Sequence, residues 1–408
     1  MTDVAQQGPL RALLVENIHP TAAEALTTAG FEVERVDRAL EGDELIKRLD
    51  GVHVLGIRSG TTVRAEVFAQ ADALRAVGAF CIGTNQIDLK TATAHGVAVF
   101  NAPFSNTRSV VELAIAEIIA LTRRMTVHDA NMHAGVWKKS ATGSHELRGR
   151  SLGIIGYGNI GSQLSVLAEA LGMRVFFYDT ADKLALGNAQ RCSTLDELLG
   201  ASDVVSLHVD GRPGNSGLFG GDLFARMRPG AVFLNLSRGF VVDQAALRQH
   251  IDSGHISGAA IDVFPEEPAG AGDPFESELR GLKNVILTPH IAGSTEEAQE
   301  DIGTFVAGKL IAYVQAGTTA LSVNLPSVQL PRQPRSTRLL VLHRNQPGAM
   351  ARIDGLLAQH GLNIEQQVLS TTGGVGFAVT DVPGAIRAEV IEELRQMSET
   401  IRVEALLP

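Results

Sequence analysis

The sequence has few cysteines and no long apolar run, and each shortage excludes a class of protein. Its two cysteines, Cys81 and Cys192, lie far apart and outside any CxxC or Cys/His spacing. We therefore expect neither a disulfide framework nor a metal site, and we interpret both as small buried apolar residues. The segment Met1–Pro9 lacks the apolar core of a signal peptide, and no later stretch is long and apolar enough to cross a membrane. We expect a cytoplasmic protein without a membrane partner.

An excess of basic residues is also missing. The 408 residues include 35 Lys and Arg against 45 Asp and Glu, a net charge of -10, and the two signs are mixed along the chain. This balance argues against nucleic-acid binding, and it requires a local basic cluster for any negatively charged substrate. With 45% hydrophobic residues the chain can bury more than one core, and its length predicts two or three domains.

Short β-type runs alternate with helical stretches in two series along the chain. The first series runs from Leu10 to Phe100 and the second from Leu152 to His290, a pattern typical of parallel sheets wrapped by helices. Between them, Ser109-Val-Val-Glu112 has the spacing of a capping box and predicts a long helix that begins at Ser109. The helical stretch 295–315 follows the second series. We expect it to return to the first unit, which would then be discontinuous.

The composition changes after Asn324, where Pro326, Pro331 and Pro334 stand among polar residues. Such a segment predicts a stiff, extended linker. The patterns between residues 339 and 406 then predict the order strand, helix, strand, strand, helix, strand. This βαββαβ order fits a ferredoxin-like sandwich.

A glycine-rich motif opens the second series. The apolar run Leu152–Ile155 leads into Gly156-Tyr-Gly158-Asn-Ile-Gly161 and then a helical stretch, and Asp179 ends the next run, eighteen positions after Gly161. Glycines at these positions let the backbone approach a pyrophosphate at a helix N-terminus, and the acid accepts hydrogen bonds from ribose hydroxyls. Because Asp179 would repel a 2′-phosphate and Thr180 adds no positive charge, the motif predicts NAD rather than NADP.

Three residues able to do chemistry follow successive apolar runs in the same region. Arg238 follows the first run, Glu267 the second and His290 the third. Each alone has an ordinary explanation, as a surface arginine, part of an acidic turn, or a histidine with local hydrogen bonds. Parallel strands, however, bring their carboxyl ends to one crevice, so the three side chains are expected to meet beyond a dinucleotide site.

Oxidation of a 2-hydroxy acid needs these residue types. A histidine serves as the base for the hydroxyl proton near neutral pH, and a neighbouring carboxylate orients its ring and raises its pKa. We predict these roles for His290 and Glu267. Arginine matches a carboxylate with two parallel hydrogen bonds, so we predict that Arg238 holds the substrate carboxylate.

Several motifs resemble a known family, the D-2-hydroxyacid dehydrogenases. The resemblance lies in Asn235–Gly239, Ile261–Pro268 and Thr288–Gly293, in the same order after the glycine motif. The D-3-phosphoglycerate dehydrogenase group of that family is similar over nearly the whole chain, in the stretches Gly56–Ser59, Phe80–Asp88, Val99–Val110 and Gly135–Lys139. The resemblance implies that Arg238, Glu267 and His290 are the catalytic residues. The cofactor-binding residues expected from the motif and the resemblance are Gly156, Gly158, Asn159, Ile160, Gly161, Asp179, Leu236, Ser237, Asp262, Ile291, Ala292 and Gly293.

The resemblance also implies where the substrate binds. Arg58, Ser59 and Asn106 match family residues that touch it, and the basic residues Arg108 and Lys139 are candidates to hold a phosphate. The alternative for Lys138–Lys139 is an ordinary solvated surface pair. Gly60 departs from the bacterial pattern, which has another arginine there. We expect this difference to affect how tightly the phosphate is bound and not which reaction is catalysed.

The C-terminal motifs resemble an ACT domain, a small-molecule sensor. They are His343-Arg-Asn345-Gln-Pro-Gly348 and Gly361-Leu-Asn363-Ile. The resemblance implies that His343, Asn345 and Asn363 bind the effector L-serine at an interface between subunits, which makes the protein a homo-oligomer, with a homotetramer suggested by family likeness. The alternative is a turn with a capping asparagine and a Pro-Gly breaker.

The expected fold class is α/β. It comprises two doubly wound parallel-sheet domains, a Rossmann NAD-binding domain and a flavodoxin-like substrate domain, and a C-terminal ferredoxin-like βαββαβ ACT domain. The expected boundaries are 1–107 with 297–325 for the substrate-binding domain, 108–296 for the NAD-binding domain, 326–337 for the linker and 338–408 for the ACT regulatory domain.

The expected function is oxidation of D-3-phosphoglycerate to 3-phosphohydroxypyruvate with NAD, the first step toward L-serine, under feedback inhibition by L-serine. One alternative is another dehydrogenase of the family, such as a reductase of 2-oxoglutarate or hydroxypyruvate. A second is an NAD-sensing regulatory protein, since transcriptional corepressors share this fold; the acidic balance and the ACT domain speak against it.

Overall fold

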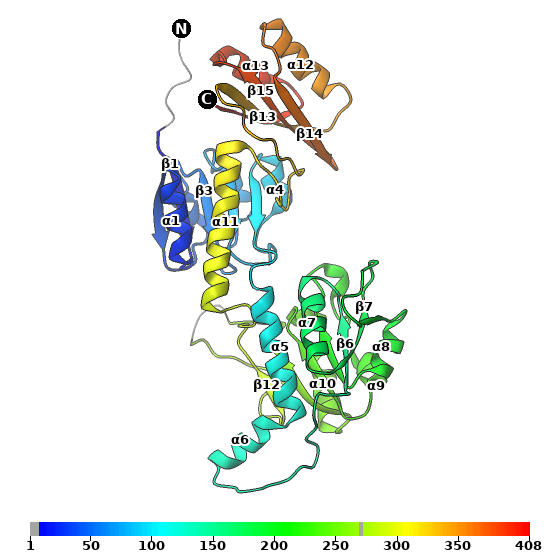
Figure 1. The fold of residues 1–408 in the computed structure, drawn as a ribbon. Coiled ribbons are helices and arrows are strands. Elements are labelled where there is room, and N and C mark those ends of the chain that lie inside the picture. The colour runs from blue at the N-terminus through cyan, green and yellow to red at the C-terminus, as the bar shows by residue number, and fades with distance from the viewer. Residues whose placement is uncertain (1–7, 269–271) are drawn as a thin grey trace. The chain divides into compact units, whose positions relative to one another are not determined.

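The computed structural model describes residues 8–268 and 272–408. Most of the segment Met1–Pro9, in which we expected no signal peptide, therefore lies outside the described residues. The chain forms two compact units. The first combines residues 1–105 with residues 299–408, and the second comprises residues 106–298. Each unit is built around its own sheets (Figure 1).

The first unit contains a five-stranded sheet in which every neighbouring pair is parallel. The strand order is β2-β1-β3-β4-β5, the doubly wound order of flavodoxin-like folds. Strands β3, β4 and β5 are fully buried, as expected for a sheet covered by helices on both faces. The strands are β1 (Leu10–Val15), β2 (Phe31–Val36), β3 (Val54–Ile57), β4 (Ala76–Ala79) and β5 (Ala98–Asn101), and the helices are α1 (Pro20–Thr28), α2 (Gly42–Arg48), α3 (Ala65–Phe68), α4 (Leu89–Ala94) and α11 (Glu296–Ala316).

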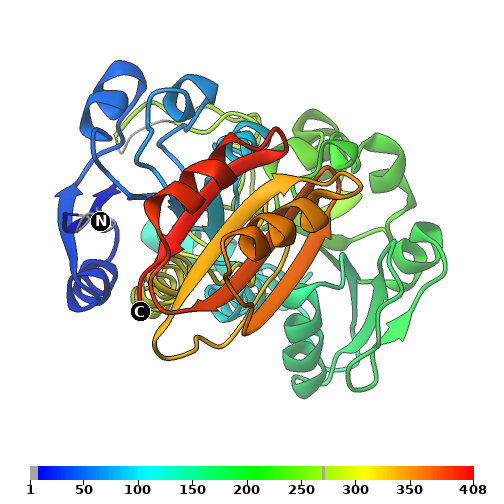
Figure 2. The same cartoon turned by 90° about the horizontal axis from the view of Figure 1, so that it is seen from above.

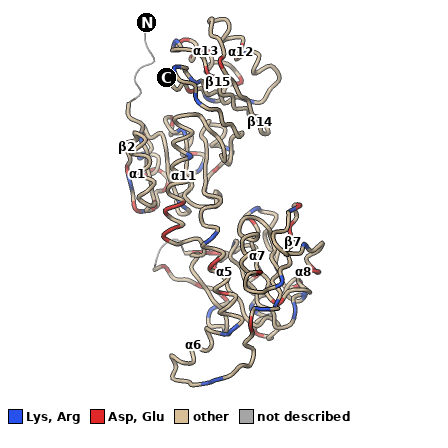
Figure 3. The backbone as a smooth tube through the Cα atoms, viewed as in Figure 1, with Lys and Arg blue, Asp and Glu red and all other residues tan. Residues whose placement is uncertain are grey.

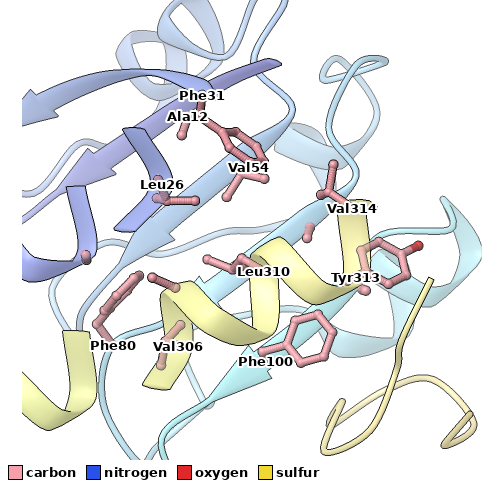
Figure 4. Packing of buried hydrophobic residues seen from close by; sticks show 14 of the residues in the cluster. Ala12, Leu26, Phe31, Val54, Phe80, Phe100, Val306, Leu310, Tyr313 and Val314 are labelled. Carbon is pink, nitrogen blue, oxygen red and sulfur yellow. The ribbon is translucent and has the colours of Figure 1, made fainter. Parts of the chain in front are cut away.

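Helix α11 packs its apolar side on one face of this sheet although it lies almost two hundred residues after β5 in the chain. Val306, Leu310 and Tyr313 join the buried cluster around Phe80 and Phe100 (Figure 4). Gly78 on β4 makes the close approach possible, because a Cβ added there would lie 2.7 Å from a methyl group of Val306. The sheet and the returning helix therefore share one core.

The second unit contains a seven-stranded parallel sheet. Its order is β12-β11-β10-β9-β6-β7-β8, so the chain reverses direction between β6 and β9, the switch point at which such folds bind ligands. The strands are β6 (Ser151–Ile155), β7 (Arg174–Tyr178), β8 (Gln190–Arg191), β9 (Val204–Leu207), β10 (Ala231–Asn235), β11 (Ile256–Ile261) and β12 (Val285–Leu287). The helices are α5 (Thr107–Thr122), α6 (Met125–His133), α7 (Asn159–Ala170), α8 (Leu195–Ala201), α9 (Gly221–Arg226) and α10 (Gln244–Asp252), with 3-10 turns η1 (Pro213–Asn215) and η2 (Gly239–Val241).

The predicted capping box at Ser109 was wrong. Helix α5 already begins at Thr107, after Asn106 as the capping position. The Ser109 hydroxyl lies 2.9 Å from the Thr295 hydroxyl, and Glu112 pairs with Arg108 one turn earlier at 2.5 Å. Both side chains of the pattern thus have partners elsewhere, and the local spacing could not reveal those partners.

The C-terminal part of the first unit forms a four-stranded antiparallel sheet of order β14-β15-β13-β16. Two helices cover one face of it (Figure 2), with Ile353, Leu357 and Leu394 buried against the strands. Its elements are β13 (Ser336–Arg344), α12 (Ala349–Gln359), β14 (Gln366–Thr372), β15 (Val375–Pro383), α13 (Ala388–Gln396) and β16 (Thr400–Leu406). The predicted fold class, with two parallel doubly wound sheets and a βαββαβ sandwich, is confirmed.

Charges of both signs are interspersed along the backbone (Figure 3). Over residues 8–268 and 272–408, no helix has the length and apolar character to span a membrane, and no three His, Cys, Asp or Glu side chains gather as metal ligands would. Within the part of the chain that the structure describes, neither cysteine forms a disulfide. Cys192 is buried as expected, whereas Cys81 is half-buried, and its thiol bonds the Gly83 carbonyl oxygen at 3.2 Å.

A buried ion pair joins the β13 and β15 strands to the segment that precedes them. Arg338 is fully buried, and its guanidinium binds both carboxylate oxygens of Asp381 at 2.6 and 2.7 Å. It also donates to the carbonyl oxygens of Ala316, Leu330 and Pro331 at 2.7 to 2.9 Å. Each N–H group of the Arg338 guanidinium therefore has an acceptor, and its charge is compensated without water.

We predict that Arg338→Ala lowers the stability of the first unit by about 3–5 kcal/mol, because it leaves the buried Asp381 carboxylate without its counter-charge. Urea unfolding followed by circular dichroism measures the change. Arg387→Ala, at an exposed arginine whose ion pair is 3.7 Å long, serves as the control and should have a much smaller effect. Equal effects of the two substitutions would contradict the prediction.

Candidate active site

The glycine-rich loop between β6 and α7 leaves one open side for a ligand. Gly156 has φ 93°, and a Cβ added to it would lie 2.5 Å from the carbonyl oxygen of His208, so only glycine fits. A Cβ on Gly161 would collide with the Gly156 carbonyl, whereas one on Gly158 would meet nothing within 4 Å. Helix α7 begins directly after Gly158, so unpaired backbone N–H groups point at this open side. These features fit the pyrophosphate of a dinucleotide.

Asp179 lies at the lip of the same loop. One of its carboxylate oxygens accepts the Tyr157 N–H at 2.8 Å and the other accepts the Ala181 N–H at 2.8 Å. A carboxylate oxygen has a second lone pair, so both remain able to accept ribose hydroxyls. Of the other expected cofactor residues in the loop, Asn159 is exposed at the first turn of α7 and Ile160 is half-buried.

The loop after β9 is a part of this region that sequence reasoning missed. His208 is half-buried, its Nε2 lies 2.9 Å from the Ser206 hydroxyl, and its carbonyl lies against Gly156. Burial lowers the pKa of His208 to about 4, so the ring is neutral at pH 7. Its position after the strand beside β6, at the switch point of the sheet, is the signal that could have identified it.

Arg238 follows β10 in a loop that an internal amide organises. The buried Asn235 accepts the Ser237 hydroxyl at 2.8 Å and donates to the Arg238 carbonyl at 3.1 Å. Ser237 and its neighbour Leu236 are both buried, so these two expected cofactor residues can offer only limited surface to a ligand. Gly239 allows the loop to lie against the backbone of Phe264, because a Cβ there would overlap that backbone. The loops after β10 and β11 are therefore in direct contact.

Asp262, at the end of β11, holds the loop that carries His290. One of its carboxylate oxygens accepts the Thr288 hydroxyl at 2.6 Å and the Ile291 N–H at 2.8 Å, and the other accepts the Ala292 N–H at 2.9 Å. Asp262 is 1% exposed. Both oxygens are thus used within the protein, and an effect of Asp262 on a cofactor would act through the loop.

His290 itself adopts a left-handed backbone with φ 53°, which is uncommon for a residue other than glycine. Its N–H donates to the Asp262 carbonyl at 2.9 Å, which keeps this conformation in place. The imidazole Nδ1 lies 2.8 Å from a Glu267 carboxylate oxygen, and the other oxygen of Glu267 accepts the Phe264 N–H at 3.1 Å. The ring is therefore oriented by an anchored carboxylate.

The electrostatics of the pair favour a protonated imidazole. The hydrogen bond with Glu267 raises the pKa of His290, and burial lowers it. The negative charges of Glu267 and Asp262 raise this pKa further, and the positive charge of Arg238 lowers it. Burial would raise the pKa of Glu267, but its hydrogen bonds and the charges of His290 and Arg238 lower it. Arg238, Glu267 and His290 thus interact electrostatically, as a group that handles a proton beside a bound anion should.

The residues expected to bind substrate fall into two units. In the first unit, Arg58 and Ser59 follow β3, and the Glu16 carboxylate holds their loop by accepting the N–H groups of Arg58, Gly60 and Thr61 at 2.7 to 3.0 Å. Sequence reasoning missed Glu16, although an acid directly after β1 is a strand-end signal. A Cβ at Gly60 would lie 3.0 Å from a Glu16 oxygen, so the tight loop explains why glycine is accommodated there.

The other expected substrate residues lie in the second unit. Asn106 precedes α5, its side chain packs against Gly293, and its buried Oδ1 has no protein partner. Arg108 pairs with Glu112 at the surface, and Lys139 is exposed in the loop after α6. Within residues 106–268 and 272–298, the structure brings Asn106 to the loop after His290, and it shows no bond from Arg108 or Lys139 to the catalytic group.

The expected effector residues lie at both ends of β13: His343 and Asn345 at its end, and Asn363 near its start, two residues before Glu365, whose carboxylate accepts the Ser336 hydroxyl. His343 is 2% exposed, with its Nδ1 2.9 Å from the Arg344 carbonyl oxygen, its ring against Gly376 and its Nε2 without a partner. Asn345 and Asn363 are exposed, on the loops before and after α12. The asparagines are therefore accessible to a ligand, and the histidine is covered by β15.

Comparison with known proteins agrees with this geometry. Residues 115–292 match the model of the D-isomer specific 2-hydroxyacid dehydrogenase NAD binding domain, and residues 339–402 match an AHAS small subunit-like ACT domain. The chain is 48% identical to a D-3-phosphoglycerate dehydrogenase of Haemophilus influenzae over 97% of both chains, and 46% identical to one of Escherichia coli over 98% of both. The structure of D-lactate dehydrogenase from Aquifex aeolicus complexed with NAD and lactic acid is 26% identical, with a TM-score of 0.68, over 78% of this chain and 100% of that one.

We predict that Glu267→Gln lowers the pKa of the His290 imidazole. The variant loses the carboxylate that raises this pKa and keeps burial and Arg238, which lower it. The ring proton of His290, followed by NMR against pH and identified by its absence in a His290→Gln variant, measures the shift. Glu266→Gln removes a neighbouring exposed carboxylate and should leave the titration unchanged. Identical titration curves for Glu267→Gln and the parent protein would refute the pairing.

Proposed function

The chain belongs to the D-isomer specific 2-hydroxyacid dehydrogenases, in the group of the D-3-phosphoglycerate dehydrogenases, and we propose that it oxidises D-3-phosphoglycerate to 3-phosphohydroxypyruvate. It is an NAD-dependent enzyme. The observation that supports the proposed reaction most directly is the 2.8 Å contact between His290 and Glu267 in a loop anchored by Asp262, with Arg238 near enough to influence both pKa values. The names of the relatives support the substrate.

The proton is handled by the histidine and its carboxylate partner. Because Nδ1 is bonded to Glu267, the neutral ring carries its proton on Nδ1, and Nε2 has a free lone pair for the substrate hydroxyl. After Nε2 takes that proton, the imidazolium is stabilised by Glu267 and Asp262. In the reverse direction, the same imidazolium returns the proton to the carbonyl oxygen.

Arg238 and the glycine loop supply binding and orientation. The Arg238 fork is suited to the substrate carboxylate, which fixes the reacting carbon relative to Nε2 of His290. Bound NAD supplies the hydride acceptor. Gly156 and Gly158 would accommodate its pyrophosphate, Asp179 its adenosine ribose, and the loop Ile291–Gly293 its nicotinamide half.

The phosphate of the substrate requires a positive charge beyond Arg238. We assign Arg58, Ser59 and Asn106 to substrate contacts, with Arg108 and Lys139 as the further basic residues. Glu16 supports this assignment, because it organises the backbone of the Arg58 loop while leaving the arginine side chain free of a carboxylate partner in the described bonds. A guanidinium of this kind is available to an anion.

The C-terminal sandwich is assigned a regulatory role. We propose that residues 338–408 bind L-serine through His343, Asn345 and Asn363, and that the protein is a homotetramer. Exposed apolar residues support association: helix α6 has no buried residue, and Trp137 in the loop after it is 81% exposed. Met125, Met132 and Val136 of the same stretch are also exposed, and a second copy of the chain would cover such a patch. We assign residues 1–107 with 297–325 to substrate binding, 108–296 to NAD binding and 326–337 to the linker.

We predict that the enzyme reduces NAD with D-3-phosphoglycerate and prefers it to D-glycerate by about a hundredfold in kcat/KM, because the missing phosphate leaves basic groups unpaired. Absorbance of NADH measures both rates. His290→Ala should lower kcat by a factor of about 10²–10⁴ while NADH binding, followed by fluorescence, stays unchanged. Preference for an unphosphorylated 2-hydroxy acid would overturn the substrate, and near-normal turnover of the variant would overturn the base.

We predict that L-serine inhibits this oxidation and that the double substitution Asn345→Ala with Asn363→Ala abolishes the inhibition without lowering kcat, because both side chains lie outside the catalytic unit. Initial rates with and without L-serine measure it, with D-serine as the control ligand. If L-serine has no effect on the parent enzyme, the regulatory assignment is wrong. If the double variant is inhibited as strongly, the residues are wrong.

A further inference from the structure

A buried carboxyl group without a partner lies behind the active site. Glu117 on α5 is 3% exposed, and both of its oxygens are inaccessible and have no hydrogen-bond partner. The other deeply buried acids behave differently: Asp262 has three donors to its carboxylate, and Asp381 has Arg338. A buried charge without compensation is strongly unfavourable, so Glu117 requires a physical explanation.

The side of α5 that carries Glu117 faces the sheet. Helix α5 packs against β10, β11, β12 and α7, and the residues one and two turns away, Val110 and Ala114, belong to the buried cluster that also contains Ala260 and Ala292. Ala292 is one of the residues whose N–H donates to Asp262. Glu117 thus shares a dry core with the residues on either side of the Asp262 carboxylate.

Asp262 is the charged group that acts on Glu117. Burial, and after it the negative charge of Asp262, raises the pKa of Glu117 to about 8. Strands β10, β11 and β12 contain no ionisable residue, and beyond them Glu267 and His290 are paired with each other. The remaining ionisable residues of the elements packed on α5 are Glu169 on α7, which bonds Asn188, and His128, Asp129 and His133 on α6, a helix without buried residues.

We propose that Glu117 is a positioning residue: it is protonated and neutral in the active enzyme, so that Asp262, which keeps the His290 loop in its working conformation, is the one charged group of this core. Two carboxylates in one dry site cannot both be ionised, and Asp262, with its three donors, is the one that stays charged. Loss of the Glu117 proton would place a second negative charge beside Asp262 and weaken its hold on residues 288–292.

Two consequences follow for the pH dependence. In the proposed oxidation, neutral His290 is the base, so its own titration does not lower the rate at high pH; ionisation of Glu117 does, above pH about 8. Stability follows the same group. The folded state holds the Glu117 proton to higher pH than the unfolded chain, whose glutamate titrates near 4.5. The contribution of Glu117 to stability therefore falls as pH rises from that value to about 8 and is constant above it.

Glu117→Gln tests the proposal because an amide keeps a donor and cannot ionise. We expect the variant to keep kcat at pH 7 within about threefold, to lose the alkaline fall in oxidation, and to gain melting temperature relative to the parent enzyme between pH 5 and 8. Glu117→Met also cannot ionise, and it should share the flat alkaline profile of Glu117→Gln. Glu276→Gln, at an exposed acid in the same unit, should reproduce the parent profile.

Only the kcat measurements of this test depend on the proposed function. NADH affinity, measured by fluorescence against pH, and the melting temperatures need no substrate, so they report on Glu117 even if D-3-phosphoglycerate is not oxidised. Retention of the parent pH dependence of NADH binding and melting in Glu117→Gln would overturn the proposal. So would an alkaline fall in the kcat of Glu117→Met equal to that of the parent enzyme. If Glu117→Gln does not fold, the parent enzyme alone can test the proposal. An NADH affinity that is constant from pH 6 to 10 would then overturn it.

Discussion

The geometry of the active site depends on one buried carboxylate. Asp262 ends β11 and gathers a hydroxyl and two backbone N–H groups from the loop after β12, within 2.6 to 2.9 Å. Its carbonyl oxygen also holds His290 in a left-handed conformation that the backbone would otherwise avoid. The Nδ1 contact with Glu267 is possible only because the histidine starts from that position. Removal of this carboxylate would therefore affect both the base and the cofactor loop.

The same device recurs at other strand ends. Glu16 after β1 holds the Arg58 loop through three N–H groups, and Asn235 at the end of β10 holds the Arg238 loop through its side-chain amide. In each case a short polar side chain on a rigid strand satisfies the backbone of a loop that carries function. Within each unit, parallel strands place such loops at one edge of that unit's own sheet, and the anchors limit their motion. Catalytic side chains can then remain partly exposed without losing their orientation.

Much of this was predictable from local pattern. The run that Asp179 ends is β7, and the glycine motif stands between β6 and α7 as its spacing required. The start of α5 was wrong because Ser109 and Glu112 bind Thr295 and Arg108, partners that a capping pattern cannot anticipate. Glu16 and His208 were missed although each directly follows a strand, and Glu117 was missed because nothing in its helix distinguishes it. Their roles arise from contacts with residues 40 to 150 positions away.

The sequence by itself determined the chemistry and the class of the fold. The periodicity of apolar runs specifies parallel sheets, since it reflects which faces must be buried, and the spacing of glycines, acid, arginine and histidine specifies NAD and a hydride-transfer reaction. Only the tertiary structure decided which groups are charged. A pKa depends on burial and on neighbours brought together by folding, so the raised pKa of His290, the neutral His208 and the protonated Glu117 are properties of the packed core and not of the residues that compose it.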